Sequence, residues 1–245
     1  MKRKNILQGL LLLIGVVFYS SRAYAMHIAE GFLPIEWAGV WWIIALPFLI
    51  LGIRRIRELV NDKGIEIKML LAVAGAFVFV LSSLKLPSIT GSCSHPTGIG
   101  LGAILFGPGP MVVLGTIVLI FQALLLAHGG LTTLGANVFS MAIVGAFVAY
   151  GIYSLAKKLG LPIWAAVFSG AAIGNLITYT VTAAQLSLAF PGQSGFLNSL
   201  LEFMSVFSIT QIPLAITEGL LTVLVFNFLR AYSKDELREL SIIGR

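Results

Sequence analysis

The chain has 245 residues, of which 58% are hydrophobic and only 11% are charged, and its mean hydropathy is +0.98. Since soluble domains carry about 25% charged residues, this composition excludes an ordinary soluble enzyme and predicts an integral membrane protein. The net charge of +6 does not form a nucleic-acid-binding patch, because the basic residues stand at the ends of apolar segments. The single cysteine, Cys93, excludes an internal disulfide and a thiolate metal site.

The beginning of the chain has the layout of a secretory signal peptide. Three basic residues precede an apolar stretch, residues 6–19, which is shorter than the roughly 20 residues that a membrane-spanning helix needs. Small residues follow, with Ala23 and Ala25 at the positions that signal peptidase prefers. We therefore expect residues 1–25 to be a cleavable signal peptide and residues 26–245 to form a single transmembrane domain. An uncleaved signal anchor is the alternative.

Seven apolar segments follow the predicted cleavage site, and they predict an all-α integral membrane protein, a compact bundle of about seven transmembrane helices. The segments are residues 37–53, 67–84, 98–106, 111–127, 137–155, 162–190 and 209–229. The third is too short to cross a bilayer alone, so we expect it inside the bundle, closed by the glycines and prolines of residues 107–110. Gly170, Ala171 and Gly174 predict close packing of the sixth helix against a neighbour.

The basic residues predict the orientation of the bundle. If the mature N-terminus is outside, eleven lysines and arginines lie on one side of the membrane and only Lys85 lies on the other, as the positive-inside rule requires. We therefore expect a multi-pass protein of the cell inner (plasma) membrane, with its C-terminus in the cytoplasm. The eleven residues are Arg54, Arg55, Arg57, Lys63, Lys68, Lys157, Lys158, Arg230, Lys234, Arg238 and Arg245.

Candidate metal ligands lie directly after the predicted cleavage site. Cleavage would leave Met26 as the first residue, and an α-amine releases its proton near pH 8, so a metal can displace that proton at little cost. This amine, the amide nitrogen of His27 and the imidazole of His27 would form two fused chelate rings in one plane. His95, in a loop with Pro96, is the candidate for the fourth corner. Planar nitrogen ligation suits nickel or copper, and nitrogen ligands also suit cobalt. Ordinary surface or loop histidines are the alternative.

Other site chemistries fit the sequence less well. It contains no His-Glu-x-x-His pair, no Cys-x-x-Cys pair and no Gly-x-x-x-x-Gly-Lys-Ser/Thr phosphate loop, so the energy for active transport would come from a partner or an ion gradient. Glu218 is a functional candidate, because carboxyl groups are rare within membrane spans, and a packing role is its alternative. We expect the other polar residues within the spans to hold helices together. These are Gln122, Asn175, Gln185 and Gln211.

Three segments of the chain resemble one known family. Residues 26–34 (MHIAEGFLP), 94–98 (SHPTG) and 128–141 (HGGLTTLGANVFSM) are similar to segments of the CbiM proteins, the substrate-binding membrane subunits (S components) of cobalt energy-coupling-factor transporters. The resemblance covers essentially the whole chain after Ala25.

The resemblance implies a seven-helix S component that holds its metal near the outer face. By carry-over, Met26, His27 and His95 would supply four nitrogen ligands. His128, Thr132 and Asn137 lie in one of the similar segments, and we expect them at most to contact the ligands rather than to bind the metal themselves. The metal would be a transported substrate rather than a catalytic cofactor.

The resemblance also implies the biological role. The chain would be the substrate-specificity subunit of an ATP-driven Co²⁺ uptake transporter that supplies cobalamin biosynthesis, and it would not be an enzyme itself. The implied partners are a CbiQ-like transmembrane coupling subunit, CbiO-like ATPase subunits and a CbiN-like small accessory membrane protein. Since the sister NikM family shares the N-terminal Met-His, Ni²⁺ uptake is the first alternative. A metal-independent membrane scaffold or channel is the second.

Overall fold

The computed structural model describes residues 27–240, apart from residues 85, 88–92 and 194. The predicted signal peptide and Met26 therefore lie outside the described residues. The first half of the chain contains α2 (Ile35–Lys63), α3 (Ile67–Ser83), the two-residue strands β1 (Leu86–Pro87) and β2 (Cys93–Ser94), α4 (Ile99–Phe106) and α5 (Pro108–Leu126). The strands pair in antiparallel fashion, with Leu86 opposite Ser94.

The second half of the chain is entirely helical in its described elements. It contains α6 (Leu134–Asn137), the π-helical η2 (Val138–Gly145), α7 (Ala146–Lys158), α8 (Ile163–Ala189), α9 (Gly195–Tyr232) and α10 (Lys234–Glu239). The first three of these run on without a break over Leu134–Lys158. Within the described part of the chain, α2, α5, the helix over Leu134–Lys158, α8 and α9 are long and apolar enough to cross a membrane, and α3 is a shorter apolar helix. The predicted all-α membrane bundle is confirmed.

The predicted helix boundaries were wrong at two places. α9 begins at Gly195, well before the predicted residue 209, because Asn198 and Glu202 interrupt the apolar pattern without interrupting the helix. α2 continues through its basic cluster to Lys63, since arginine and lysine are good helix formers once the chain has left the apolar layer.

The short helix α4 lies inside the bundle, as predicted, and all eight of its residues are buried. It contacts α5, α7 and α8. Small residues make this possible, because a Cβ at Gly100 would lie 2.9 Å from the Cα of Ala171 on α8. Gly174 packs in the same way against Ala149 of α7, where an added Cβ would lie 2.8 Å from the Ala149 Cβ. Van der Waals contact between small residues is what holds helices together in lipid.

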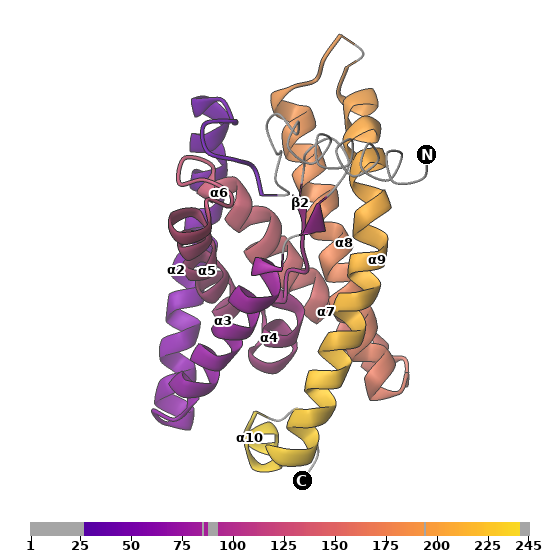
Figure 1. Cartoon of the computed structure of the whole chain (residues 1–245). Helices are drawn as coiled ribbons and strands as arrows, with labels where there is room; N and C mark the ends of the chain where they lie inside the picture. Colours follow the sequence, from indigo (N-terminus) through magenta and orange to yellow (C-terminus); the bar gives the residue numbers. More distant parts are fainter. Residues whose placement is uncertain (1–26, 85, 88–92, 194, 241–245) are drawn as a thin grey trace, which may run out of the picture.

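The two ends of the bundle differ in character. At one end lie the C-terminal ends of α2 and α9 and the whole of α10, which form the lower end of the molecule in Figure 1. Most of the lysines and arginines among the described residues belong to this end, in the last turns of α2, α7 and α9 and in α10. Strand β2 and helix α6 lie toward the opposite end (Figure 1), and the three histidines belong to the segments around them.

Candidate metal centre

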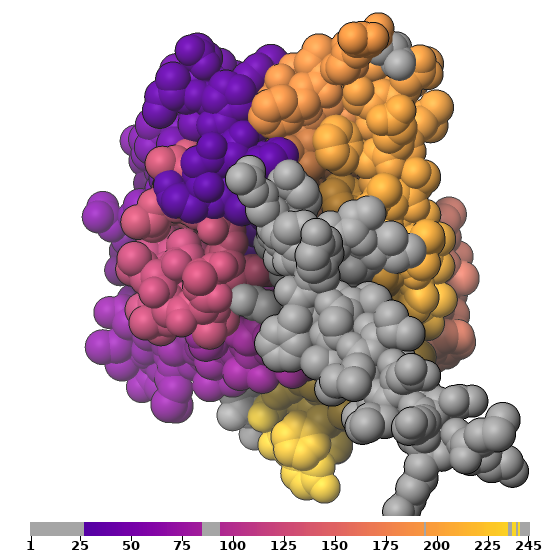
Figure 2. Space-filling model, turned by 45° about the horizontal axis from the view of Figure 1, so that its top comes forward, coloured from indigo at the N-terminus to yellow at the C-terminus, as the bar shows by residue number. Residues whose placement is uncertain are grey.

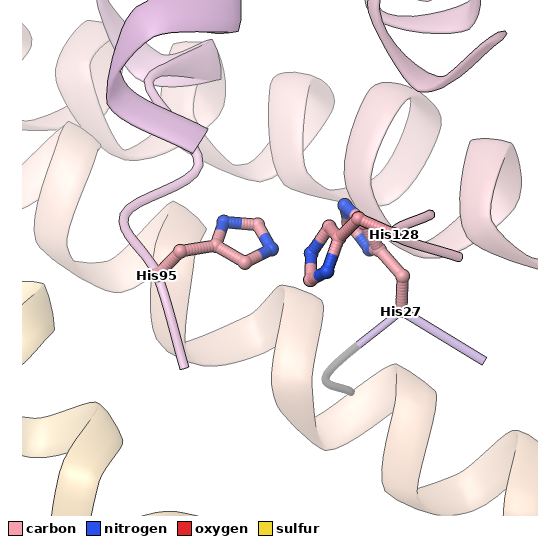
Figure 3. A group of neighbouring side chains, drawn as sticks. All are labelled: His27, His95 and His128. Carbon is pink, nitrogen blue, oxygen red and sulfur yellow. The ribbon is translucent and has the colours of Figure 1, made fainter. Parts of the chain in front are cut away.

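The three histidines of the chain come together in one buried cluster. The ring centroids of His27, His95 and His128 are 4.7 Å apart in each of the three pairs. Each residue offers a ring nitrogen, and these nitrogens lie within 4.8 Å of one another. The three side chains are 4%, 0% and 1% exposed, respectively, so the cluster is shielded from solvent. In Figure 3 the His95 ring points toward the other two rings from a separate segment.

Metal binding would require a contraction of this cluster. Metal–imidazole nitrogen bonds of about 2.0–2.1 Å place two nitrogens of one ion at most about 4.2 Å apart, and three nitrogens around one ion cannot all be that far apart. The three nitrogens, which lie within 4.8 Å of one another, therefore have to move closer together to hold one divalent ion. Imidazole suits zinc, copper, iron and nickel, and it is the only ligand type in the cluster, so the site favours a transition metal over calcium or magnesium.

His27 is held in place by the docking of the segment that follows it. Asn137 accepts a hydrogen bond from the Ile28 amide at 2.9 Å and donates one from Nδ2 to the Ile28 carbonyl at 3.1 Å. The Thr133 hydroxyl donates to the same carbonyl. A single side chain on α6 thus pairs with both backbone groups of the residue next to His27, in the way that a neighbouring strand would.

The next residues of this segment bind the loop between α5 and α6. The Glu30 carboxylate accepts hydrogen bonds from the amides of Leu131 and Thr132, and the Thr132 hydroxyl accepts one from the Gly31 amide at 3.0 Å. The hydrogen bond of Glu30 with the Thr132 side chain, assisted by these amides, lowers the pKa of Glu30, although desolvation acts in the opposite direction. Figure 2 shows the start of the described chain, in indigo, beside this loop, in pink, and the ends of α8 and α9, in orange.

Glycines make this close approach possible. A Cβ at Gly130 would lie 2.5 Å from the Cα and 2.6 Å from the nitrogen of Glu30. Gly129 has a φ of +76°, and a Cβ there would lie 3.2 Å from the Cβ of His27. The paired glycines after His128 therefore leave room for the backbone of the N-terminal segment.

The loop that carries His95 is tied to α8 and α9. The Ser94 hydroxyl lies 2.7 Å from the Thr210 hydroxyl, and Tyr179 donates a hydrogen bond to the His95 carbonyl at 2.8 Å. The His95 Nδ1 lies 2.8 Å from the Pro96 carbonyl oxygen. Because that oxygen can only accept, Nδ1 carries the proton, and the lone pair of the neutral ring is on Nε2.

Glu218 on α9 anchors the same loop through hydrogen bonds. Its carboxyl group accepts hydrogen bonds from the Thr97 amide at 2.6 Å, the Thr97 hydroxyl at 2.8 Å and the Gly98 amide at 2.9 Å. Asn175 on α8 donates a fourth, through Nδ2. All four partners are donors, so Glu218 is a buried clamp that joins the His95 loop to two long helices.

His128 stands where α5 turns into the following loop. Ala127 adopts a left-handed conformation, with a φ of 46°, and the His128 amide donates to the Gln122 carbonyl at 3.1 Å. The turn carries the His128 side chain back into the cluster. We expected His128 behind the ligands, but its ring lies as close to His27 as the His95 ring does.

Two polar residues of the spans contribute more than the sequence indicated. Gln122 joins α5 to Ser82 of α3, as expected of a residue that holds helices together, but its Oε1 also lies 3.2 Å from Nε2 of His27. Asn137, placed behind the ligands at most, binds the backbone next to His27. Both residues could have been identified from the sequence, because each has an amide side chain and stands close in the sequence to the loop that begins at His128. Met26 lies outside the described residues, so its role as a ligand stays a prediction.

Comparisons with known proteins agree with this architecture. Residues 27–236 match the profile of a family described as CbiM, "Cobalt uptake substrate-specific transmembrane region". The cobalt transport protein CbiM of Acetohalobium arabaticum is 68% identical over 244 residues, which span 100% of this chain and 97% of that protein. The protein of the same name from Moorella thermoacetica is 59% identical and covers 99% of this chain and 94% of its own length.

A solved structure is also similar. A crystal structure described as a transition metal transporter superposes with a TM-score of 0.74 at 28% sequence identity, covering 85% of this chain and 94% of that one. A second crystal structure, described as a truncated transition metal transporter, gives a TM-score of 0.73 at 28% identity and covers 84% of this chain and 99% of its own length. The similarity to these proteins identifies a multi-pass membrane transport component rather than an enzyme. The chain therefore belongs to the CbiM family of cobalt-uptake, substrate-specific transmembrane proteins.

Proposed function

We propose that this chain is the substrate-specificity subunit of an ATP-driven energy-coupling-factor transporter, and that it captures Co²⁺ at the outer face of the membrane. The observation that carries the proposal is the convergence of all three histidines, two of them on segments docked by dedicated hydrogen bonds, in one buried cluster. A buried group of three imidazoles, with no carboxylate in the cluster among the described residues, suits a divalent transition metal.

The proposed ligands are the α-amine of Met26, the amide and imidazole of His27, and the imidazole of His95. Met26 directly precedes His27, so its amine can reach an ion that is bound by Nδ1 of the His27 ring. The Nε2 of His95 carries the lone pair, as its contact with the Pro96 carbonyl requires, which supports its assignment as the fourth nitrogen. Cleavage before Met26 is part of this proposal, because only cleavage creates the free amine.

Cobalt is preferred over nickel because the similar proteins are named cobalt transport proteins. Planar nitrogen ligation by itself suits Ni²⁺, so nickel uptake is the competing function. If His128 also bound the metal, its imidazole would add a fifth nitrogen, which would favour cobalt over four-coordinate planar Ni²⁺.

The energy and the partners are proposed on sequence grounds. The chain contains no phosphate-binding loop, so ATP would be hydrolysed by CbiO-like subunits, with a CbiQ-like coupling subunit and a CbiN-like accessory protein in the membrane. The excess of basic residues at the end of the bundle remote from the histidines supports a cytoplasmic location for that end. Imported cobalt would supply cobalamin biosynthesis.

Two measurements test the proposal. N-terminal sequencing of the mature protein should give Met26 as the first residue, and any other start would remove the amine ligand. Cells with the complete transporter should accumulate cobalt, and His27→Ala should abolish that accumulation. Ile35→Ala is a matched control, because Ile35 is exposed at the start of α2, in the same part of the chain. Undiminished uptake by the His27→Ala variant would contradict the proposal.

A further inference from the structure

A buried chain of hydrogen bonds leads from the backbone of α3 to the His27 ring. Ser82 Oγ lies 2.5 Å from the Val78 carbonyl oxygen, Gln122 Nε2 lies 2.6 Å from Ser82 Oγ, and Gln122 Oε1 lies 3.2 Å from His27 Nε2. Ser82 and Gln122 are each 0% exposed, so water does not compete for these contacts.

The direction of each bond in this chain is determined by the first one. Ser82 has one hydroxyl proton, and its oxygen lies so close to the Val78 carbonyl oxygen, at 2.5 Å, that this proton must lie between the two oxygens. The Ser82 oxygen must therefore face Gln122 with a lone pair, and the Gln122 atom beside it must be the amide NH₂. The carbonyl oxygen of Gln122 then faces His27, so the Nε2 of His27 must carry the proton.

The consequence concerns which nitrogen of His27 can bind a metal. In a neutral imidazole, protonation of Nε2 leaves the lone pair on Nδ1. Only Nδ1 is close enough to the backbone to close a six-membered chelate ring with the amide nitrogen of the same residue. We infer that Gln122, oriented by Ser82, is a positioning residue that selects the chelating tautomer of His27. This inference rests on the proposed metal site and deepens it.

The imidazoles of His27 and His95 are thus held in opposite tautomers, one by a side-chain acceptor and the other by a backbone acceptor. The Pro96 carbonyl holds the proton of His95 on Nδ1, whereas the Gln122 side chain holds the proton of His27 on Nε2. The first acceptor is backbone and cannot be changed by substitution. The second depends on two side chains, so it can be tested by mutation.

The test uses the small number of histidines. Because the chain has three, nitrogen-15 labelling of histidine in the full protein, without a histidine tag, gives three imidazole signal sets that His27→Ala and His95→Ala assign. In metal-free protein at about pH 8, where imidazoles are neutral, we expect His27 to be protonated on Nε2. Ser82→Ala leaves the Gln122 amide free to turn over, so we expect a large fraction of His27 to shift to the Nδ1-protonated form.

Metal affinity gives a second readout. Loss of an outer partner of a metal-binding histidine typically weakens binding by about 10–100-fold, and we expect this for cobalt with Ser82→Ala and with Gln122→Leu. Gln122→Glu, unlike Gln122→Leu, should keep His27 in the Nε2-protonated form, because a carboxylate also accepts a hydrogen bond from Nε2. Ser187→Ala is the matched control, since Ser187 is equally buried and its hydroxyl donates to the Ala183 carbonyl on α8.

The outcomes separate this inference from the proposed function. Nδ1 protonation of His27 in the wild type, or an unchanged tautomer in Ser82→Ala, would overturn the inference. If the wild type with a Met26 terminus fails to bind cobalt, the proposed function is overturned instead, and the tautomer measurement still decides the role of Gln122.

Discussion

The Asn137 side chain pairs with both backbone groups of Ile28, accepting from its amide at 2.9 Å and donating to its carbonyl at 3.1 Å. These two bonds hold in place the residue that directly follows His27, although the partners are 109 residues apart in the sequence. The position of the first histidine therefore depends on α6 as much as on its own segment.

Asn137→Asp tests this pairing. The aspartate would place an acceptor opposite the Ile28 carbonyl, and an unsatisfied buried polar group costs about 1–3 kcal/mol, or roughly 5–150-fold in affinity. We expect cobalt binding by the purified protein, followed by calorimetry, to weaken within that range. Asn61→Asp is the control, because Asn61 is exposed near the end of α2 at the other end of the bundle. Equal affinities for the two variants would mean that the pairing does not position His27.

Gly130→Ala tests the close approach of the N-terminal segment to the loop. The new Cβ would lie 2.5 Å from the Glu30 Cα, which is backbone and can move only if the docked segment moves with it. We expect cobalt uptake to fall sharply. Gly151→Ala should leave uptake unchanged, because nothing lies within 4 Å of a Cβ at that exposed position on α7. Wild-type uptake by Gly130→Ala would show that the segment docks differently.

The lowered pKa of Glu30 predicts that acid weakens the docking of the N-terminal segment against the loop between α5 and α6. Since its pKa is lowered in the folded protein by the Thr132 side chain and the loop amides, the stability that it contributes is present above its ordinary pKa. That stability is lost as the pH falls through the lowered value. We expect the difference in melting temperature between wild type and Glu30→Gln to shrink from pH 6 to pH 3. Glu36→Gln, on α2, is the control. A difference that is constant with pH would rule out this linkage.

Glu218→Gln tests the clamp on the His95 loop. The variant would turn an NH₂ group toward partners that are all donors, the amides of Thr97 and Gly98 among them. At about 1–3 kcal/mol for a lost buried partner, we expect lower thermal stability and weaker cobalt binding, although Glu218 is not a proposed ligand. Thr217→Ala changes the neighbouring exposed residue of the same helix and should have little effect on either. Normal binding by Glu218→Gln would assign the clamp to stability alone.

His128→Ala tests whether the third imidazole binds the metal. Because its ring centroid is 4.7 Å from those of both other histidines, we expect the cobalt absorption spectrum to change and the affinity to fall by at least about tenfold. The loss should be greater for cobalt than for nickel, which accepts a planar set of four nitrogens. If the cobalt spectrum is unchanged, His128 only packs beside the site.

The number and type of the helices could be predicted from the sequence alone. Long apolar segments must form helices in lipid, because every backbone polar group there has to be satisfied within its own segment. The short helix α4 was recognisable because Pro108 and Gly107 limit its length and because eight residues cannot cross a bilayer. The predicted boundaries were wrong where polar residues interrupt the apolar pattern without ending the helix, as at Asn198 and Glu202 in α9 and in the basic cluster of α2.

The sequence also determined the candidates for the site, since His27 and His95 stand in its most distinctive segments, whereas the tertiary structure decided their neighbours. Gln122 meets His27 across 95 residues, and Glu218 meets Thr97 across 121. Such contacts depend on how each helix is rotated about its axis. In a membrane bundle the lipid-facing and the core-facing side of a helix are both apolar, so hydropathy does not encode that rotation. Only packing of the folded helices brings His128 and Gln122 to His27.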